Sequence, residues 1–208
     1  MELVKILEKT YGSDVPIFID DIKAVMGKYS STGQYSTPYV FRCIKEAVSK
    51  NELIRYDESI YYIPSETVFG KSALNLYSVI EKKYMRDGSR VSGFYSGWTF
   101  LNAIGGTRQV PNVLEIVTNR ETMKVRETTL GKQRLILRKP RCRITNENGK
   151  ILQILELASQ FEFDNDRSAA VADFAKTNNV GIKDLLNYTE YYPARAIKNM
   201  KGVLYELA

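Results

Sequence analysis

The residues best suited to chemistry in this sequence are cationic and aromatic side chains on the outward side of one predicted helix. The stretch TPYVFRCIKEAVSKN, residues 37–51, places Tyr39, Arg42, Lys45 and Lys50 opposite its apolar residues. Guanidinium and ammonium groups bind phosphate oxygens, and an arginine can also pair with the edge of a guanine. The pattern favours contact with double-stranded DNA, and the alternative is an ordinary solvated helix face.

Three neighbouring positions extend this candidate surface. Ser36 and Thr37 stand at the start of the helix, after a polar loop that includes Ser31 and Thr32, and such hydroxyls can donate to phosphates or form turns. Arg55 belongs to the hairpin that follows the helix. Because Asp57 and Glu58 come at the tip of that hairpin, we expect it to contribute little to phosphate binding.

A second cationic region runs from residue 120 to residue 143, where nine basic residues accompany only two acidic ones. Extended structure here would put alternate residues on one face. The region can be a second DNA surface, a surface for RNA or for the substrate of a partner protein, or a basic edge strand that blocks aggregation. The charge excess favours a nucleic-acid surface. Its candidate contacts are Arg126, Arg134, Arg138, Lys139, Arg141 and Arg143.

Catalysis is disfavoured by the residue types that are missing. The sequence has no histidine and only two cysteines, Cys43 and Cys142, which removes the common general base and the usual zinc ligands. A magnesium nuclease would need an acid-x-lysine beside Glu115, and the next strand offers Lys124 and Glu127 in another spacing. We therefore expect no catalytic residue, no metal and no cofactor, and the nuclease is the less favoured alternative.

The element order gives the fold expected around these residues. Helices over 2–10, 22–26 and 37–51 surround a short extended piece at 16–19, and two β-rich runs follow at 53–56 and 60–63. This is the order of a winged helix-turn-helix, in which the third helix enters the DNA major groove. The net charge of −2 over residues 1–68 counts against strong binding.

The remainder predicts a second domain after a linker at 64–70. We expect helices over 72–85 and 93–104, a strand at 113–118, two or three strands within 123–144, and three or four C-terminal helices. The predicted class is α+β: an N-terminal winged helix-turn-helix over 1–66, followed by a mixed α/β C-terminal domain over 71–208. The chain has no apolar run near 18 residues, and its cysteines read as free thiols, so a cytoplasmic location is expected.

The stretch GFYSGWTFLNAIGGTRQVPNVLEIVTNRE, residues 93–121, resembles the C-terminal domain of the AbiEi antitoxins. The segment PIFIDDIKAVM and the helix and hairpin after it are similar to the winged-helix domain of those proteins. The resemblance implies the antitoxin of a type IV toxin–antitoxin system in bacterial abortive infection, an antiviral defence. Such a protein represses its own operon by binding inverted repeats, with two copies on the DNA. It neutralises a nucleotidyltransferase-like toxin without a stable complex. The alternative is an interaction module that sequesters a partner without sequence-specific DNA binding.

Overall fold

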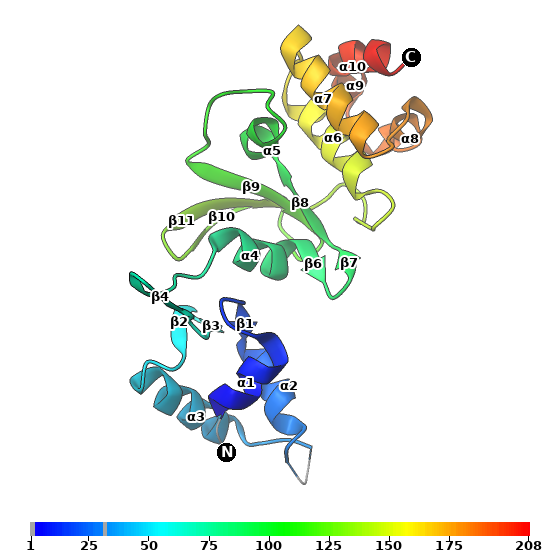
Figure 1. The fold of residues 1–208 in the computed structure, drawn as a ribbon. Helices are drawn as coiled ribbons and strands as arrows, with labels where there is room; N and C mark the ends of the chain where they lie inside the picture. Colours follow the sequence, from blue (N-terminus) through cyan, green and yellow to red (C-terminus); the bar gives the residue numbers. More distant parts are fainter. Residues whose placement is uncertain (1–2, 31–32) are drawn as a thin grey trace. The chain divides into compact units, whose positions relative to one another are not determined.

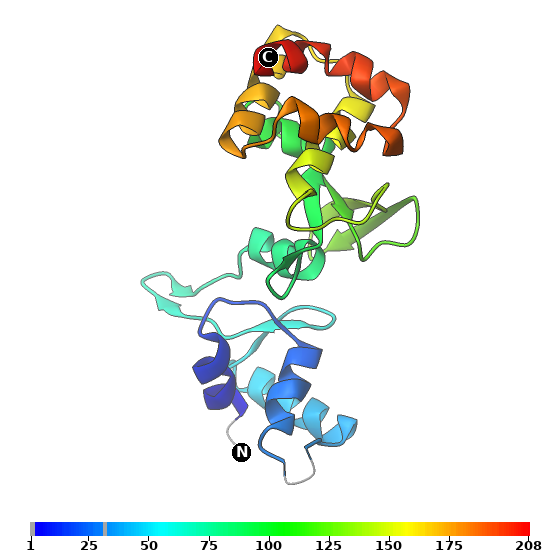
Figure 2. The ribbon, with the colours of Figure 1, turned by 90° about the vertical axis from the view of Figure 1, so that its right-hand side faces the viewer.

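The chain folds as two compact units, Met1–Lys83 and Tyr84–Ala208. The computed structural model describes residues 3–30 and 33–208 (Figures 1 and 2). Both units combine helices with small sheets, so the predicted α+β class is confirmed. Ser31 and Thr32 lie outside the described residues. The first unit has 11 basic and 11 acidic residues, and the second has 19 and 13.

Three helices and a three-stranded sheet build the main part of the first unit. The strands pair antiparallel in the order β1-β3-β2. The elements are α1 (Leu3–Tyr11), β1 (Ile17–Phe18), α2 (Ile19–Gly27), α3 (Thr37–Ser49), β2 (Ile54–Asp57) and β3 (Ile60–Tyr62). Each helix buries one apolar stripe in a shared core, as its spacing predicts. These stripes are Leu3 and Leu7 from α1, Ile22, Val25 and Met26 from α2, and Val40, Ile44 and Ala47 from α3.

The segment after β3 belongs to the first unit, which extends to Lys83. It forms a small hairpin, β4 (Glu66–Thr67) and β5 (Gly70–Lys71), and then reaches α4 (Leu76–Ile80). Hydrogen bonds tie it to earlier residues: Asp14 accepts from Ser65 and Ser72, and Asp21 accepts from Lys82 Nζ at 2.7 Å. Polar side chains of the expected linker thus hold it against the first unit.

A four-stranded sheet forms the centre of the second unit. The order is β10-β11-β9-β8, with β9 parallel to β11 and the other pairs antiparallel. Its strands are β8 (Gly93–Ser96), β9 (Val113–Thr118), β10 (Val125–Leu130) and β11 (Gln133–Arg138). A π-helical turn (Glu81–Met85) crosses the division between the units, and a hairpin of β6 (Arg86–Asp87) and β7 (Arg90–Val91) precedes the sheet.

Helices complete the second unit. Helix α5 contacts β9, α6 contacts β8, and the helices after α6 gather around it (Figure 1). These are α5 (Gly97–Ala103), α6 (Gly149–Gln160), α7 (Asn165–Thr177), α8 (Ile182–Leu186), α9 (Ala194–Asn199) and α10 (Lys201–Leu207), with a 3-10 turn at Thr189–Tyr191. Helix α6 is buried along nearly its whole length, so it is the centre of the helical core.

Two predictions for the second unit were wrong in detail. Residues 93–96 form strand β8 rather than the start of a helix, because Gly97 has φ of +56° and interrupts the chain before α5. Its missing Cβ also leaves room for Glu115, whose carboxylate oxygen would lie 2.0 Å from such a carbon. The strands predicted within 123–144 end at Arg138, and the chain from 139 to 144 is irregular.

Asp14 makes the first unit sensitive to acid. Hydrogen bonds from the Ser65 and Ser72 hydroxyls hold the pKa of its carboxyl below the usual value. A carboxyl with a lowered folded-state pKa stabilises the fold above its unfolded pKa of about 3.9 and loses that effect as pH falls through the folded value. Asp14→Asn should therefore lower the free energy of unfolding at pH 7, and the deficit should shrink as pH falls below about 4.

Urea unfolding followed by circular dichroism at several pH values measures this difference. Asparagine keeps the shape and tolerates the φ of +60° at position 14. Glu66→Gln, which changes an exposed carboxylate on β4, is the control and should leave the pH dependence unchanged. A deficit that is the same at pH 7 and pH 3 would contradict the role given to Asp14.

Candidate nucleic-acid interface

Helix α3 presents a mixed cationic and aromatic face to solvent. Its buried stripe turns Arg42 and Lys45 outward, and both are exposed, as the sequence predicts. Phe41 was expected in the buried stripe, but 47% of its surface is exposed. One helical residue is 100° of rotation, so Phe41, one position after the buried Val40, falls at the rim of the stripe and beside Arg42. The face therefore combines a guanidinium, an ammonium and an aromatic ring.

Two stacked tyrosines position Arg42. The Arg42 guanidinium carbon lies 5.0 Å from the centre of the Tyr39 ring. Tyr39 in turn stacks on Tyr35, with ring centres 5.0 Å apart and planes at 22°. The Tyr35 hydroxyl donates to the Tyr29 carbonyl at 3.3 Å, which ties the stack to the end of α2. Cation–π contact orders a guanidinium without cancelling its charge, so Arg42 stays available to an anion.

The loop between α2 and α3 is held by a close backbone approach at Gly27. A Cβ on Gly27 would lie 2.6 Å from the Gly33 carbonyl oxygen, so any other residue would displace the loop. Ser36 is the N-cap residue and Thr37 the first residue of α3, and both are exposed. The Ser36 side chain makes no capping hydrogen bond to the helix backbone.

The two remaining candidates of the first unit, Lys50 and Arg55, differ in whether their side chains are already engaged by other groups. Lys50, the C-cap residue of α3, is exposed. Arg55 instead closes its own hairpin: its Nε and Nη2 donate to the carbonyls of Asp57 and Glu58, each at 3.3 Å. A bulge between Arg55 and Asp57 brings these groups together. Arg55 therefore supports the β2–β3 turn, and its Nε and one Nη2 hydrogen are already engaged there.

The basic region of the second unit is largely compensated by carboxylates. Arg126 pairs with Glu121 at 2.7 Å and Arg134 with Glu127 at 3.5 Å, both within the region. Three more carboxylates come from elsewhere in the fold and were not visible in the local sequence. They form the pairs Arg120–Asp87 at 3.8 Å, Arg138–Glu115 at 3.2 Å and Arg141–Glu156 at 3.4 Å. The net positive charge around residues 120–143 is therefore smaller in the folded structure than the sequence of that region alone suggests.

Part of the predicted region still comes together around a cavity of about 390 Å³. It is lined by Lys124, Arg138, Lys139 and Arg141, with Glu156 as its acidic member. In the described part of the chain, no ion pair engages Lys124, Lys132 or Lys139. These lysines, rather than the arginines, carry the uncompensated charge along this edge of the sheet.

Arg141 and Arg143 do not share a strand face, which corrects the extended geometry expected for them. The strand ends at Arg138 and Pro140 follows, so the two side chains leave an irregular segment in different settings. Arg141 lies over the ring of Tyr192, with its guanidinium carbon 5.3 Å from the ring centre, and reaches Glu156. Arg143 lines a different cavity, together with Arg90 and Arg120.

The groups considered for catalysis are engaged in structure. Glu115, the acid of the nuclease alternative, is bound to Arg138, and its backbone N–H donates to the Thr99 hydroxyl at 2.9 Å. Within residues 3–30 and 33–208, no cluster of three or more His, Cys, Asp or Glu side chains could hold a metal. Both cysteines are free. No helix in the same residues is long and apolar enough to cross a membrane.

Comparison with known proteins adds no family assignment. The chain matches no protein-family model, and no curated protein sequence is similar enough to match it. The resemblance of residues 93–121 to AbiEi antitoxins therefore stays a prediction.

The Arg138–Glu115 pair should stabilise the second unit more than the pairs at the surface. The Glu115 side chain is 12% exposed, and loss of its charge would leave a partly buried guanidinium whose Nε already has no hydrogen-bond partner. Glu115→Gln should therefore cost about 1–3 kcal/mol of unfolding free energy. Glu127→Gln breaks the exposed pair with Arg134 and should cost less than about 1 kcal/mol.

Denaturant unfolding followed by the fluorescence of Trp98, which packs against the core of the second unit, measures both variants. Equal effects of the two substitutions would mean that the Glu115 pair has no special structural role.

Proposed function

We propose that the protein is a sequence-specific DNA-binding repressor of the AbiEi antitoxin type, and that its first unit acts as a winged helix-turn-helix. The exposed Phe41–Arg42–Lys45 face of α3, with Arg42 ordered on Tyr39, is the observation that carries the DNA-binding part. In helix-turn-helix proteins the second helix of the motif enters the major groove. Under this proposal that helix is α3, and α2, which precedes it in the chain, is the first helix of the motif.

The first unit has the parts that such binding needs. Three helices share one core, so α3 is held firmly with one side outward. The β2–β3 hairpin follows α3 directly in the chain. In winged-helix proteins this hairpin touches the flanking DNA backbone. The tip here carries Asp57 and Glu58, and Arg55 is occupied by the turn, so base readout rests on α3.

The second unit supports this function mainly through its net positive charge. Its excess of 19 basic over 13 acidic residues attracts a polyanion over a distance of about one Debye length, roughly 8–10 Å at moderate salt. Within the described residues of the predicted region, Lys124, Lys132, Lys139 and Arg143 have no ion pair and are free to contact phosphate. Each phosphate that they neutralise would add to the salt dependence of binding.

The antitoxin role rests on the resemblance of residues 93–121. Under this proposal two copies bind an inverted repeat upstream of their own operon, and the chain counters a nucleotidyltransferase-like toxin without a stable complex. It does so in the cytoplasm. The protein-interaction alternative predicts instead a partner complex and no selective DNA binding.

A gel shift with DNA from upstream of the gene separates these alternatives. The repressor should shift the upstream DNA at concentrations at which a shuffled sequence of equal length and composition stays free. Equal retardation of both DNAs, or of neither, would exclude operator recognition. Incubation with labelled DNA and Mg²⁺ in the same series should leave the DNA intact, and cleavage would favour the nuclease.

Arg42 should carry a large part of this selectivity. If its guanidinium pairs with a guanine edge, Arg42→Ala should cost about 1–3 kcal/mol of binding free energy and relax the preference at one base pair. Tyr39→Leu, which removes only the stacked ring, should weaken binding less, because the arginine remains but is less ordered. Lys9→Ala removes an exposed cation from α1 and is the matched control, expected to bind like the wild type.

Titration against a panel of operators with single base-pair changes measures the preference. A loss that is uniform across the panel would make Arg42 a phosphate contact. An unchanged affinity would remove α3 from the interface.

A further inference from the structure

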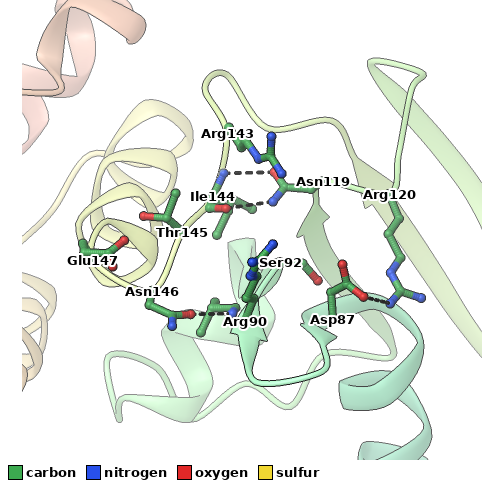
Figure 3. Close-up of a pocket in the computed structure, with 11 residues that line it drawn as sticks. Asp87, Arg90, Ser92, Asn119, Arg120, Arg143, Ile144, Thr145, Asn146 and Glu147 are labelled. Atoms are coloured by element: carbon green, nitrogen blue, oxygen red, sulfur yellow. Dashed lines mark hydrogen bonds and ion pairs between the residues drawn. The ribbon is translucent and has the colours of Figure 1, made fainter.

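We propose that the second unit holds a binding site for the phosphate group of a nucleotide-sized ligand, in a cavity of about 480 Å³ between the β6–β7 hairpin, the end of β9 and the segment before α6. This site is separate from α3 and does not depend on the DNA-binding proposal. Its cationic members are Arg90, Arg120 and Arg143 (Figure 3). Only Arg143 among them was a candidate from the sequence.

Two of these arginines are free to bind an anion. Arg120 is engaged, because its Nη2 donates to the Arg86 carbonyl at 2.8 Å and lies 3.8 Å from Asp87. Arg90 and Arg143 are exposed, and no ion pair engages either of them within the described residues. Figure 3 shows both side chains between the two acidic members of the lining, Asp87 on one side and Glu147 on the other. A guanidinium matches two phosphate oxygens with parallel N–H bonds, which favours a phosphate group here.

The wall beneath these arginines contains a hydroxyl without a partner. Ser92 is 6% exposed, and its Oγ makes no hydrogen bond. Its backbone is satisfied, since the amide donates to the Met85 carbonyl and the carbonyl accepts from Asn119, each at 2.8 Å. A buried hydroxyl left unpaired is costly and points to a bound ion or water. Because Arg90 is unpaired, its side chain can turn toward a ligand and open access to this hydroxyl.

The cavity is built on a rigid frame. Asn119 holds Ile144 by two hydrogen bonds, donating to its carbonyl at 2.8 Å and accepting from its amide at 2.9 Å. The Asn146 side chain accepts from the Val91 amide at 2.6 Å, and Asn148 fixes the Arg143 carbonyl at 3.0 Å. Asn146 thus fastens the segment that carries Arg143 to β7, Asn119 fastens it to the end of β9, and Asn148 braces the segment itself. Such preorganisation lowers the cost of ordering a binding site.

The two acidic residues of the lining do not neutralise the charges of Arg90 and Arg143, so the cavity can accept a dianion. The Asp87 carboxylate faces Arg120, and a hydrogen bond from the Thr145 hydroxyl holds the pKa of Glu147 below its usual value, so Glu147 is charged and already has a donor. The charges of Arg90 and Arg143 therefore remain for the ligand. Pockets of roughly 300–1,000 Å³ take small molecules, so a volume of about 480 Å³ suits a mononucleotide or the end of a strand better than a free phosphate ion alone.

Calorimetric titration of the full chain with inorganic phosphate, adenosine 5′-monophosphate and adenosine tests the site. The monophosphate should bind, adenosine should not, and inorganic phosphate should compete. Arg143→Gln and Arg90→Gln should each raise the Kd for the monophosphate by roughly tenfold or more, a factor that equals about 1.4 kcal/mol. Ser92→Ala should raise it by a smaller factor. Lys176→Gln removes an exposed cation from α7, away from the cavity lining, and should bind like the wild type.

A second arm identifies the source of the phosphate. Single-stranded oligonucleotides with a 5′-phosphate or a 5′-hydroxyl are compared in competition with the monophosphate. Preference for the phosphorylated strand would assign the site to nucleic-acid ends, and equal weak competition would assign it to free nucleotides. No binding of the monophosphate at millimolar concentration, or binding that Arg90→Gln and Arg143→Gln leave unchanged while circular dichroism shows a folded chain, would overturn the proposal.

Discussion

The burial of Val40, Ile44 and Ala47 decides what the first unit can offer to a partner. Successive residues of an α-helix are rotated by about 100° around its axis, so burial of three positions also determines which residues face solvent. The core leaves α3 one orientation, because α1, α2 and the small sheet supply the other sides of the same cluster. Phe41 and Arg42 reach solvent for this reason. Any function of the α3 face therefore depends on apolar contacts made on the opposite side of the helix.

The second unit is organised by a different constraint, the pairing of arginines with carboxylates that are distant in sequence. Three carboxylates that approach the basic region come from β6, β9 and α6, and each reaches its arginine only after the sheet and α6 have assembled. Parallel pairing of β9 with β11 places Glu115 opposite Ile136, two residues from Arg138. Removal of one partner from such a pair is costly when it is partly buried. The main role of these arginines is therefore to stabilise the fold through ion pairs rather than to bind a partner.

The local sequence pattern was sufficient to predict much of the fold, but it was not sufficient to predict the candidate site. The helices α1, α2 and α3 have apolar spacings that lie within a few residues, and each was predicted from that spacing, although Phe41 of α3 lies outside the buried stripe. Strand β8 was missed because its extended form depends on pairing with β9 and on the left-handed Gly97. The boundary after residue 83 depends on hydrogen bonds that Ser65 and Lys82 donate to the distant carboxylates of Asp14 and Asp21. The Arg90–Ser92–Arg143 cavity has no local motif, since three separate segments build it.

The way in which a cation is ordered determines how it can recognise an anion. A carboxylate orders an arginine but cancels most of its field, as at Arg138 and Glu115. An aromatic ring orders it and leaves its charge intact, as at Arg42 and Tyr39. The first unit has equal numbers of acidic and basic residues, so it has little long-range field to attract DNA. If α3 binds DNA, its affinity must come from short-range contacts at the face that Arg42 shares with Phe41. Short-range contacts depend on base identity far more than field attraction does, so a unit of this kind is better suited to selecting a site than to holding DNA of any sequence.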